Sequence, residues 1–87
     1  MWVFVGDGAR LPSAVFDSLA DAELWIGKEL LSGMLTAYPV GFSVYDWAVS
    51  FGFYKPSPDR PKTPSQIGSF SSAHLEHYHY ENGCRRA

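Results

Sequence analysis

The sequence predicts an α+β fold, with a small mixed sheet of about four strands and helices packed on one face. Two observations support this prediction. One is a strand–helix–strand pattern between residues 13 and 38, and the other is an unbroken apolar run at the N-terminus. In chain order the expected elements are β-β-α-β-α-(α)-β, built around a split β-α-β core.

The helix expected at residues 19–31 is the best-defined element. Ser18 precedes it as an N-cap, and Asp21 forms a weak capping box with it. An apolar stripe with helical spacing follows, made of Leu19, Ala22, Trp25, Ile26 and Leu30. We expect Trp25 and Ile26 to face the core. Gly33 should end the helix, because glycine adopts the left-handed backbone conformation freely.

Three short segments should form the centre of the sheet. Residues 13–17 and 34–38 flank the helix, so these two strands should run parallel, with a right-handed crossover. Residues 2–5 are apolar at every position, which is typical of a strand with neighbours on both sides. We therefore expect strand 2–5 to lie between the other two and antiparallel to both.

The second half of the chain predicts two shorter helices. Ser43 caps the first, and its expected apolar face contains Val44, Trp47, Ala48 and Phe51. Tyr45 points away from this face, so we expect it at the surface. Thr63 and Pro64 begin the second helix as cap and first residue.

A final strand and two irregular segments complete the expected organisation. Histidine and tyrosine alternate from about Glu76 to Tyr80, which indicates a strand. We expect residues 1–87 to form a single domain, with a proline-rich loop at 55–64 and a C-terminal tail at 84–87. Four prolines within the loop exclude a regular element there.

Composition narrows the class of protein. Apolar residues make up 46% of the 87 residues, and three Trp, five Tyr and six Phe can bury enough area for a small chain to fold. The net charge of −2 argues against duplex binding. Cys84 is the only cysteine, so no internal disulfide is expected. No signal peptide or membrane-spanning run is evident, so we expect a cytoplasmic location.

The histidines are the candidates for chemistry. On a strand His77 and His79 share a face while His74 lies opposite, so we predict no metal site from this segment alone. We predict no cofactor, because Gly6-x-Gly8 lacks a third glycine and is followed by a strand. No catalytic residue is assigned. A small metal-dependent or acid–base enzyme using His77 and His79 stays an alternative.

A second alternative is a single-stranded RNA-binding module. Lys55, Arg60 and Lys62 lie in the proline-rich loop, next to aromatic residues. Three charges in a loop are more often solvated than bound to a ligand, so we do not expect nucleic acid as the partner.

Six motifs cover nearly the whole chain, and the last two are quite specific. They are Trp2-Val3-Phe4-x-Gly6-x-Gly8-Ala9-Arg10, Val15-Phe16-x-Ser18, Ala22-Glu23-x-Trp25-Ile26, Leu35-Thr36-x-Tyr38-Pro39, Tyr45-Asp46-Trp47-Ala48 and Glu76-His77-Tyr78-His79-Tyr80-Glu81-Asn82-Gly83. Together they resemble a family of small bacterial domains of unknown function. That resemblance implies no catalytic residues. By class alone, a compact, acidic, aromatic-rich chain is similar to bacterial immunity proteins, which block secreted nuclease toxins.

We therefore expect a small cytosolic protein-binding domain that acts as an immunity protein toward a cognate toxin domain. Tyrosines and histidines offer rigid contact area, and acidic residues complement a basic partner. The residues predicted to bind the partner are Asp7, Tyr45, Asp46, Glu76, His77, Tyr78, His79, Tyr80 and Glu81.

Overall fold

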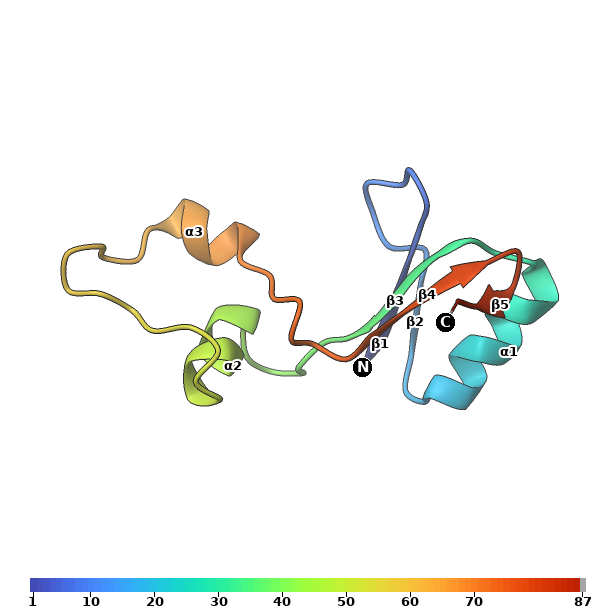
Figure 1. The fold of residues 1–87 in the computed structure, drawn as a ribbon, viewed down its shortest axis with the longest axis horizontal. Helices are drawn as coiled ribbons and strands as arrows, with labels where there is room; N and C mark the ends of the chain where they lie inside the picture. Colours follow the sequence, from blue (N-terminus) through green and yellow to red (C-terminus); the bar gives the residue numbers. More distant parts are fainter. Residues whose placement is uncertain (87) are drawn as a thin grey trace. The chain divides into compact units, whose positions relative to one another are not determined.

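The computed structural model describes residues 1–86. Their contacts divide into two compact units (Figure 1). The sheet unit comprises residues 1–38 together with the chain from Leu75 onward, and the helical unit comprises Pro39–His74. The single domain expected over residues 1–87 stays a prediction.

The elements of the described chain confirm a small mixed α/β protein and include three helices. The sheet has five strands, and every neighbouring pair is antiparallel, which corrects the prediction of a mixed sheet of about four strands. In chain order the elements are β1 (Trp2–Gly6), β2 (Ala14–Phe16), α1 (Leu19–Glu29), β3 (Gly33–Ala37), α2 (Val44–Ser50), α3 (Pro64–Ser69), β4 (His77–Glu81) and β5 (Cys84–Arg85).

The strand order is β2-β1-β3-β4-β5, and each strand is antiparallel to its neighbour. β1 therefore lies between β2 and β3, as its all-apolar sequence predicts. Val3 pairs with Val15 on one side and with Thr36 on the other. α1 joins β2 to β3, which makes the predicted split β-α-β core.

The fifth strand is a correction to the sequence-based prediction. Cys84 and Arg85 were expected in a tail, but they form β5 and pair with β4. Asn82 and Gly83 both have positive φ, of 51° and 85°, which is the backbone of a tight two-residue hairpin turn. The Asn-Gly pair therefore folds the chain back instead of releasing it. Ala87, the last residue of the expected tail, lies outside the described residues.

Helix α1 begins as predicted but ends earlier than predicted. The Ser18 hydroxyl accepts a hydrogen bond from the Asp21 backbone N–H at 3.1 Å. At the other end Leu30, not Gly33, takes the left-handed conformation, with φ of 55°. The Leu31 N–H then donates to the Ile26 carbonyl at 3.0 Å, which closes the helix. This turn exposes Leu30, predicted in the apolar stripe, and packs Leu31 against the core instead.

Gly33 has a different function from the one predicted. It is a buried residue of β3, opposite Gly6 of β1. A Cβ atom at this position would lie 2.4 Å from the Val5 carbonyl oxygen and 2.8 Å from the Gly6 Cα atom. Only a glycine lets the two strands approach this closely.

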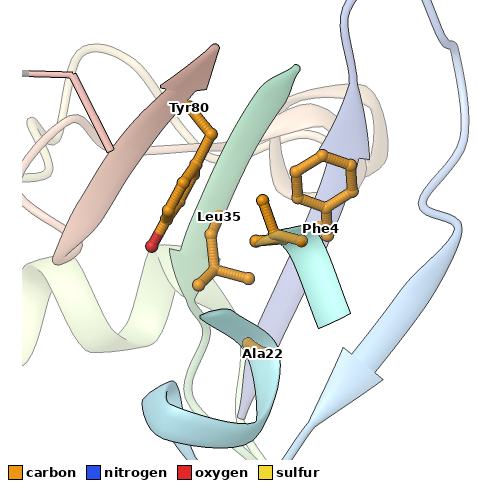
Figure 2. Close-up of a cluster of buried hydrophobic side chains, with 5 residues drawn as sticks. Phe4, Ala22, Leu35 and Tyr80 are labelled. Atoms are coloured by element: carbon orange, nitrogen blue, oxygen red, sulfur yellow. The ribbon is translucent and has the colours of Figure 1, made fainter. Parts of the chain in front are cut away.

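One face of the sheet packs against α1 and forms the core. Phe4, Leu35 and Tyr80 come from β1, β3 and β4, and they meet Ala22 and Ile26 of the helix (Figure 2). Phe4, Ile26 and Leu35 have 1% or less of their surface exposed. The Trp25 ring contacts the Phe4 ring edge-to-face at a centroid distance of 5.5 Å. The prediction that Trp25 and Ile26 face the core is confirmed.

The two helices of the helical unit begin where the sequence predicts. The Ser43 hydroxyl accepts from the Asp46 N–H at 3.0 Å, and the Thr63 hydroxyl accepts from the Gln66 N–H at 3.1 Å. Between these helices the proline-rich segment contains only an isolated bridge between Ser57 and Arg60. Residues 55–63 contain no helix or strand, and Pro64, the last residue of the predicted loop, begins α3.

Candidate functional site

Four aromatic rings in the helical unit form a connected group, which we call the aromatic cluster: Trp47, Phe51, Phe53 and His74. The Trp47 ring lies 5.5 Å from that of Phe51 and 5.4 Å from that of Phe53, measured between centroids. The Phe53 ring is stacked on His74 at 4.1 Å, with the ring planes only 8° apart. These contacts fix the rings relative to one another.

The local backbone explains why the cluster forms. Trp47 and Phe51 are four residues apart, so they lie one turn apart on the same side of α2. Gly52 has φ of 76° and reverses the chain. The Phe53 N–H then donates to the Ala48 carbonyl at 2.8 Å, which returns Phe53 to the end of the helix.

Three members of the aromatic cluster, Phe51, Phe53 and His74, are exposed, whereas Trp47 is half-buried. The exposure of Phe51 is contrary to prediction. Phe51 has 64% of its surface exposed and Phe53 has 46%. The sequence placed Phe51 on the buried face of the helix, but α2 has only seven residues and ends at Phe51 as its C-cap. The side chain therefore lies past the packed part of the helix. Gly52, directly after Phe51, is the residue at which the sequence predicts the helix to stop.

Tyr45 occupies the interior of the helical unit, which corrects its predicted exposure. It has 6% of its surface exposed. Its ring lies 5.5 Å from the Tyr54 ring and 5.2 Å from the Phe70 ring, and the Lys62 ammonium lies 5.6 Å from its centroid. The buried face of α2 thus contains Tyr45 and Ala48, in place of Trp47 and Phe51.

In the sheet unit, β4 presents two histidines on the face opposite α1. Thr36 pairs with His77 and Met34 pairs with His79, in alternation with the core residue Leu35. The prediction that His77 and His79 share a face is confirmed. Their ring centroids lie 5.5 Å apart, and His77 Nδ1 lies 2.8 Å from the Leu75 carbonyl oxygen.

A pocket of about 360 Å³ lies beside this pair. It is lined by His77, Tyr78, His79 and Arg86. The Arg86 backbone N–H donates to the His79 carbonyl at 2.7 Å, which holds this part of the chain next to β4. The Arg86 guanidinium lies 3.7 Å from the Glu81 carboxylate.

The tyrosines of β4 lie on the other face, toward α1. The Tyr80 hydroxyl donates to Glu23 at 2.6 Å, and Arg85 donates to the same carboxylate oxygen from Nε at 2.9 Å. The Tyr80 hydrogen bond, followed by that of Arg85, lowers the pKa of Glu23 although desolvation opposes the shift. Burial, followed by the bond to Glu23, raises the pKa of Tyr80 to about 12. The Tyr78 hydroxyl donates to Glu76, and this bond raises the pKa of Tyr78.

The predicted partner-binding residues therefore fall into separate groups. His77, His79 and Glu81 alternate along one face of β4, whereas Tyr78 and Tyr80 belong to the opposite face. Tyr80 has 3% of its surface exposed and offers little contact area. The remaining members lie elsewhere: Glu76 directly before β4, Asp7 directly after β1, and Tyr45 and Asp46 in α2 of the helical unit.

Residues 1–86 contain no group of three or more His, Cys, Asp or Glu side chains that could hold a metal ion. Cys84 is a free, exposed cysteine on β5. In the same residues, no helix has the length and apolar character needed to cross a membrane.

In a comparison with protein families, the chain matches a model described as "Domain of unknown function (DUF7710)" over residues 1–86. Comparison with curated proteins found no match, and comparison with solved structures found none either.

Proposed function

We propose that this chain, which belongs to the family described as Domain of unknown function (DUF7710), is a protein-binding domain that contacts its partner through the aromatic cluster. The observation that supports the proposal is the exposure of Phe51 and Phe53 within a set of mutually packed rings. When a partner covers an exposed phenylalanine, the burial favours binding by roughly 25 cal/mol for each Å² of apolar surface removed from water.

The arrangement of the rings suits an interface. Aromatic residues are enriched at the centres of protein interfaces, where a few of them supply most of the binding free energy. Trp47 contacts both phenylalanines, and His74 is stacked on Phe53. Because these contacts already restrict the side chains, binding costs less side-chain entropy.

The same unit exposes further apolar side chains. Val40 has 65% and Phe42 has 51% of its surface exposed, in the segment that leads into α2. The helical unit therefore exposes several large apolar side chains and not just one ring. Extensive exposed apolar surface is typical of interaction sites.

The finer form of the proposal is that the partner is a nuclease-type toxin domain and that the chain is an immunity protein. A nuclease binds a polyanion and so exposes basic residues. Asp46 is exposed and directly precedes Trp47, which would place a carboxylate beside the apolar contact. Charge complementarity of this kind accelerates association and selects the partner.

The main experiment measures affinity for a purified partner first identified with the wild-type chain. We expect Phe51→Ala and Phe53→Ala each to weaken binding about tenfold or more, as removal of an interface hot spot does. Leu24→Ala is the matched control, because Leu24 is 72% exposed but lies on α1 in the sheet unit. Unchanged affinity in both phenylalanine variants would contradict the proposal.

Two further measurements separate the alternatives. Protection of cells that express a toxin encoded beside the gene tests the immunity form. Lack of protection removes that form without affecting the binding proposal. Binding to single-stranded RNA, titrated against salt, tests the alternative of an RNA-binding module formed by Lys55, Arg60 and Lys62. If the affinity for RNA falls steeply with salt and depends on these three residues, the partner is RNA and the proposal of a protein partner is wrong.

A further inference from the structure

We propose that His77 and His79 form a two-imidazole binding site for a late first-row divalent cation such as Ni²⁺ or Cu²⁺. The site lies in the sheet unit and is independent of the aromatic cluster. The two residues are two positions apart on β4, so both side chains project from the face opposite α1. Imidazole nitrogen is a preferred ligand for Ni²⁺, Cu²⁺ and Zn²⁺.

The distance between the rings suits a shared ion. Two imidazole nitrogens that each lie about 2.0–2.1 Å from one metal ion place the ring centroids roughly 5 Å apart. The observed centroid distance is 5.5 Å, and the ring planes are 84° apart. His79 is exposed, so its side chain is free to turn toward an ion shared with His77.

A backbone contact prepares His77 for this function. Its Nδ1 atom lies 2.8 Å from the Leu75 carbonyl oxygen, which can only accept a hydrogen bond. Nδ1 must therefore carry the proton, so the neutral ring keeps its free lone pair on Nε2. Metal-binding histidines commonly donate their second nitrogen to a backbone carbonyl, which fixes the tautomer and the ring orientation.

The surroundings leave room for an ion and for the water molecules that would complete its coordination. The pocket of about 360 Å³ is lined by both histidines and by Arg86. The Arg86 guanidinium lies 3.7 Å from the Glu81 carboxylate, which offsets part of its charge. The ion would have two protein ligands, His77 and His79, and water would fill its other positions.

The test is a titration of the full chain with NiCl₂, and then with CuCl₂ and ZnCl₂, by isothermal calorimetry and by NMR of the histidine ring protons. We expect one ion per chain and tighter binding of Cu²⁺ than of Ni²⁺ or Zn²⁺. The His77 and His79 signals should shift with Zn²⁺ and broaden with the paramagnetic Ni²⁺ and Cu²⁺. His79→Ala should weaken Ni²⁺ binding about tenfold or more, because a single imidazole loses the advantage of a chelate.

Three variants make the assignment specific. His74→Ala should leave the affinity unchanged, because His74 is stacked on Phe53 in the helical unit. Cys84→Ser should also leave it unchanged. Arg86→Ala should strengthen cation binding, whereas an anion site in the same pocket would lose affinity for inorganic phosphate.

Several results would overturn the proposal. They are the lack of saturable Ni²⁺ binding, full affinity in the correctly folded His79→Ala variant, and a loss in His74→Ala or Cys84→Ser as large as that in His79→Ala. Because His79 is exposed, its substitution should not prevent folding, and circular dichroism checks this. A phosphate affinity that Arg86→Ala abolishes, without any metal binding, would establish an anion site instead.

Discussion

The Tyr80 hydroxyl lies 2.6 Å from a carboxylate oxygen of Glu23, a residue 57 positions earlier in the chain. Arg85 donates to the same oxygen from Nε and Nη2, at 2.9 and 2.5 Å. This carboxylate therefore connects α1 to both strands of the C-terminal hairpin. The sequence offers no local signal for such a contact, because helix and hairpin meet only when the sheet forms.

Replacing Glu23 by glutamine should lower the free energy of unfolding at neutral pH. The expected loss is about 1 kcal/mol, since the hydrogen bonds to the charged oxygen weaken and the side chain is 34% exposed, where solvent screens the interaction. Glu29→Gln is the control, because Glu29 is exposed in the last turn of the same helix. Denaturant unfolding at pH 7 measures both, and equal stability of the two variants would contradict the prediction.

The Glu23 contribution should also depend on pH. Because its pKa is lowered in the folded chain, its stabilisation is present above the ordinary glutamate pKa and is lost as pH falls through the lower, folded value. The difference in unfolding free energy between wild type and Glu23→Gln should therefore shrink in acid. A difference that stays constant down to pH 3 would contradict the prediction.

Tyr80 should cause a loss of stability in alkaline solution. Its pKa is raised to about 12 in the folded chain, so between pH 10 and 12 the unfolded chain ionises first and stability falls. At pH 11 the loss is about 1 kcal/mol. Tyr80→Phe should lack this part of the loss, although Tyr78, whose pKa is also raised, still contributes. Parallel stability curves for wild type and variant from pH 9 to 11 would disprove the assignment.

Gly33→Ala should be strongly destabilising, by about 2 kcal/mol or more, because the new methyl group would overlap the Val5 carbonyl and the Gly6 backbone. Gly27→Ala is a matched control within α1, where an added Cβ would meet only the Gly83 carbonyl at 3.7 Å. It should stabilise the helix by about 0.5–1 kcal/mol. Thermal unfolding compares them, and the prediction fails if Gly33→Ala melts at the wild-type temperature.

Leu35→Ala should reduce stability by about 2–5 kcal/mol, because Leu35 is fully buried between Phe4, Tyr80 and the helix. Leu24→Ala removes the same atoms from a side chain that is 72% exposed, so its effect should be below about 0.5 kcal/mol. Chemical denaturation of both proteins gives the difference. If both variants lost the same unfolding free energy, burial of Leu35 between the sheet and α1 would not be what stabilises the chain.

Features set by neighbours in the sequence were predictable. The three serine and threonine caps, the start of each helix and the histidine–tyrosine strand depend on hydrogen bonds or periodicity within a few residues. The central position of β1 was also predictable, because a strand that is apolar at every position is typical of the middle of a sheet and not of its edge. The sharing of a face by His77 and His79 follows from the period of two along any strand.

Features that depend on distant packing were not predictable. α2 buries Tyr45 instead of Trp47, because Tyr54 and Phe70 from later segments surround that side of the helix. Leu30 is exposed and Leu31 is packed, because the left-handed backbone at Leu30 ends the helix and directs the next side chain toward the core. The aromatic cluster was missed partly because His74 joins it only by stacking on Phe53, 21 positions earlier in the chain.

The sequence alone determined where the three helices and the first four strands form, because caps, periodicity and turn residues act over a single turn or hairpin. Only the tertiary structure decided that Cys84 and Arg85 extend the sheet, that Gly33 is needed for strand contact, and that one carboxylate joins α1 to the C-terminal hairpin. These outcomes depend on which surfaces meet when the strands pair. The pattern of residues within one segment does not specify which distant segment will pack against it.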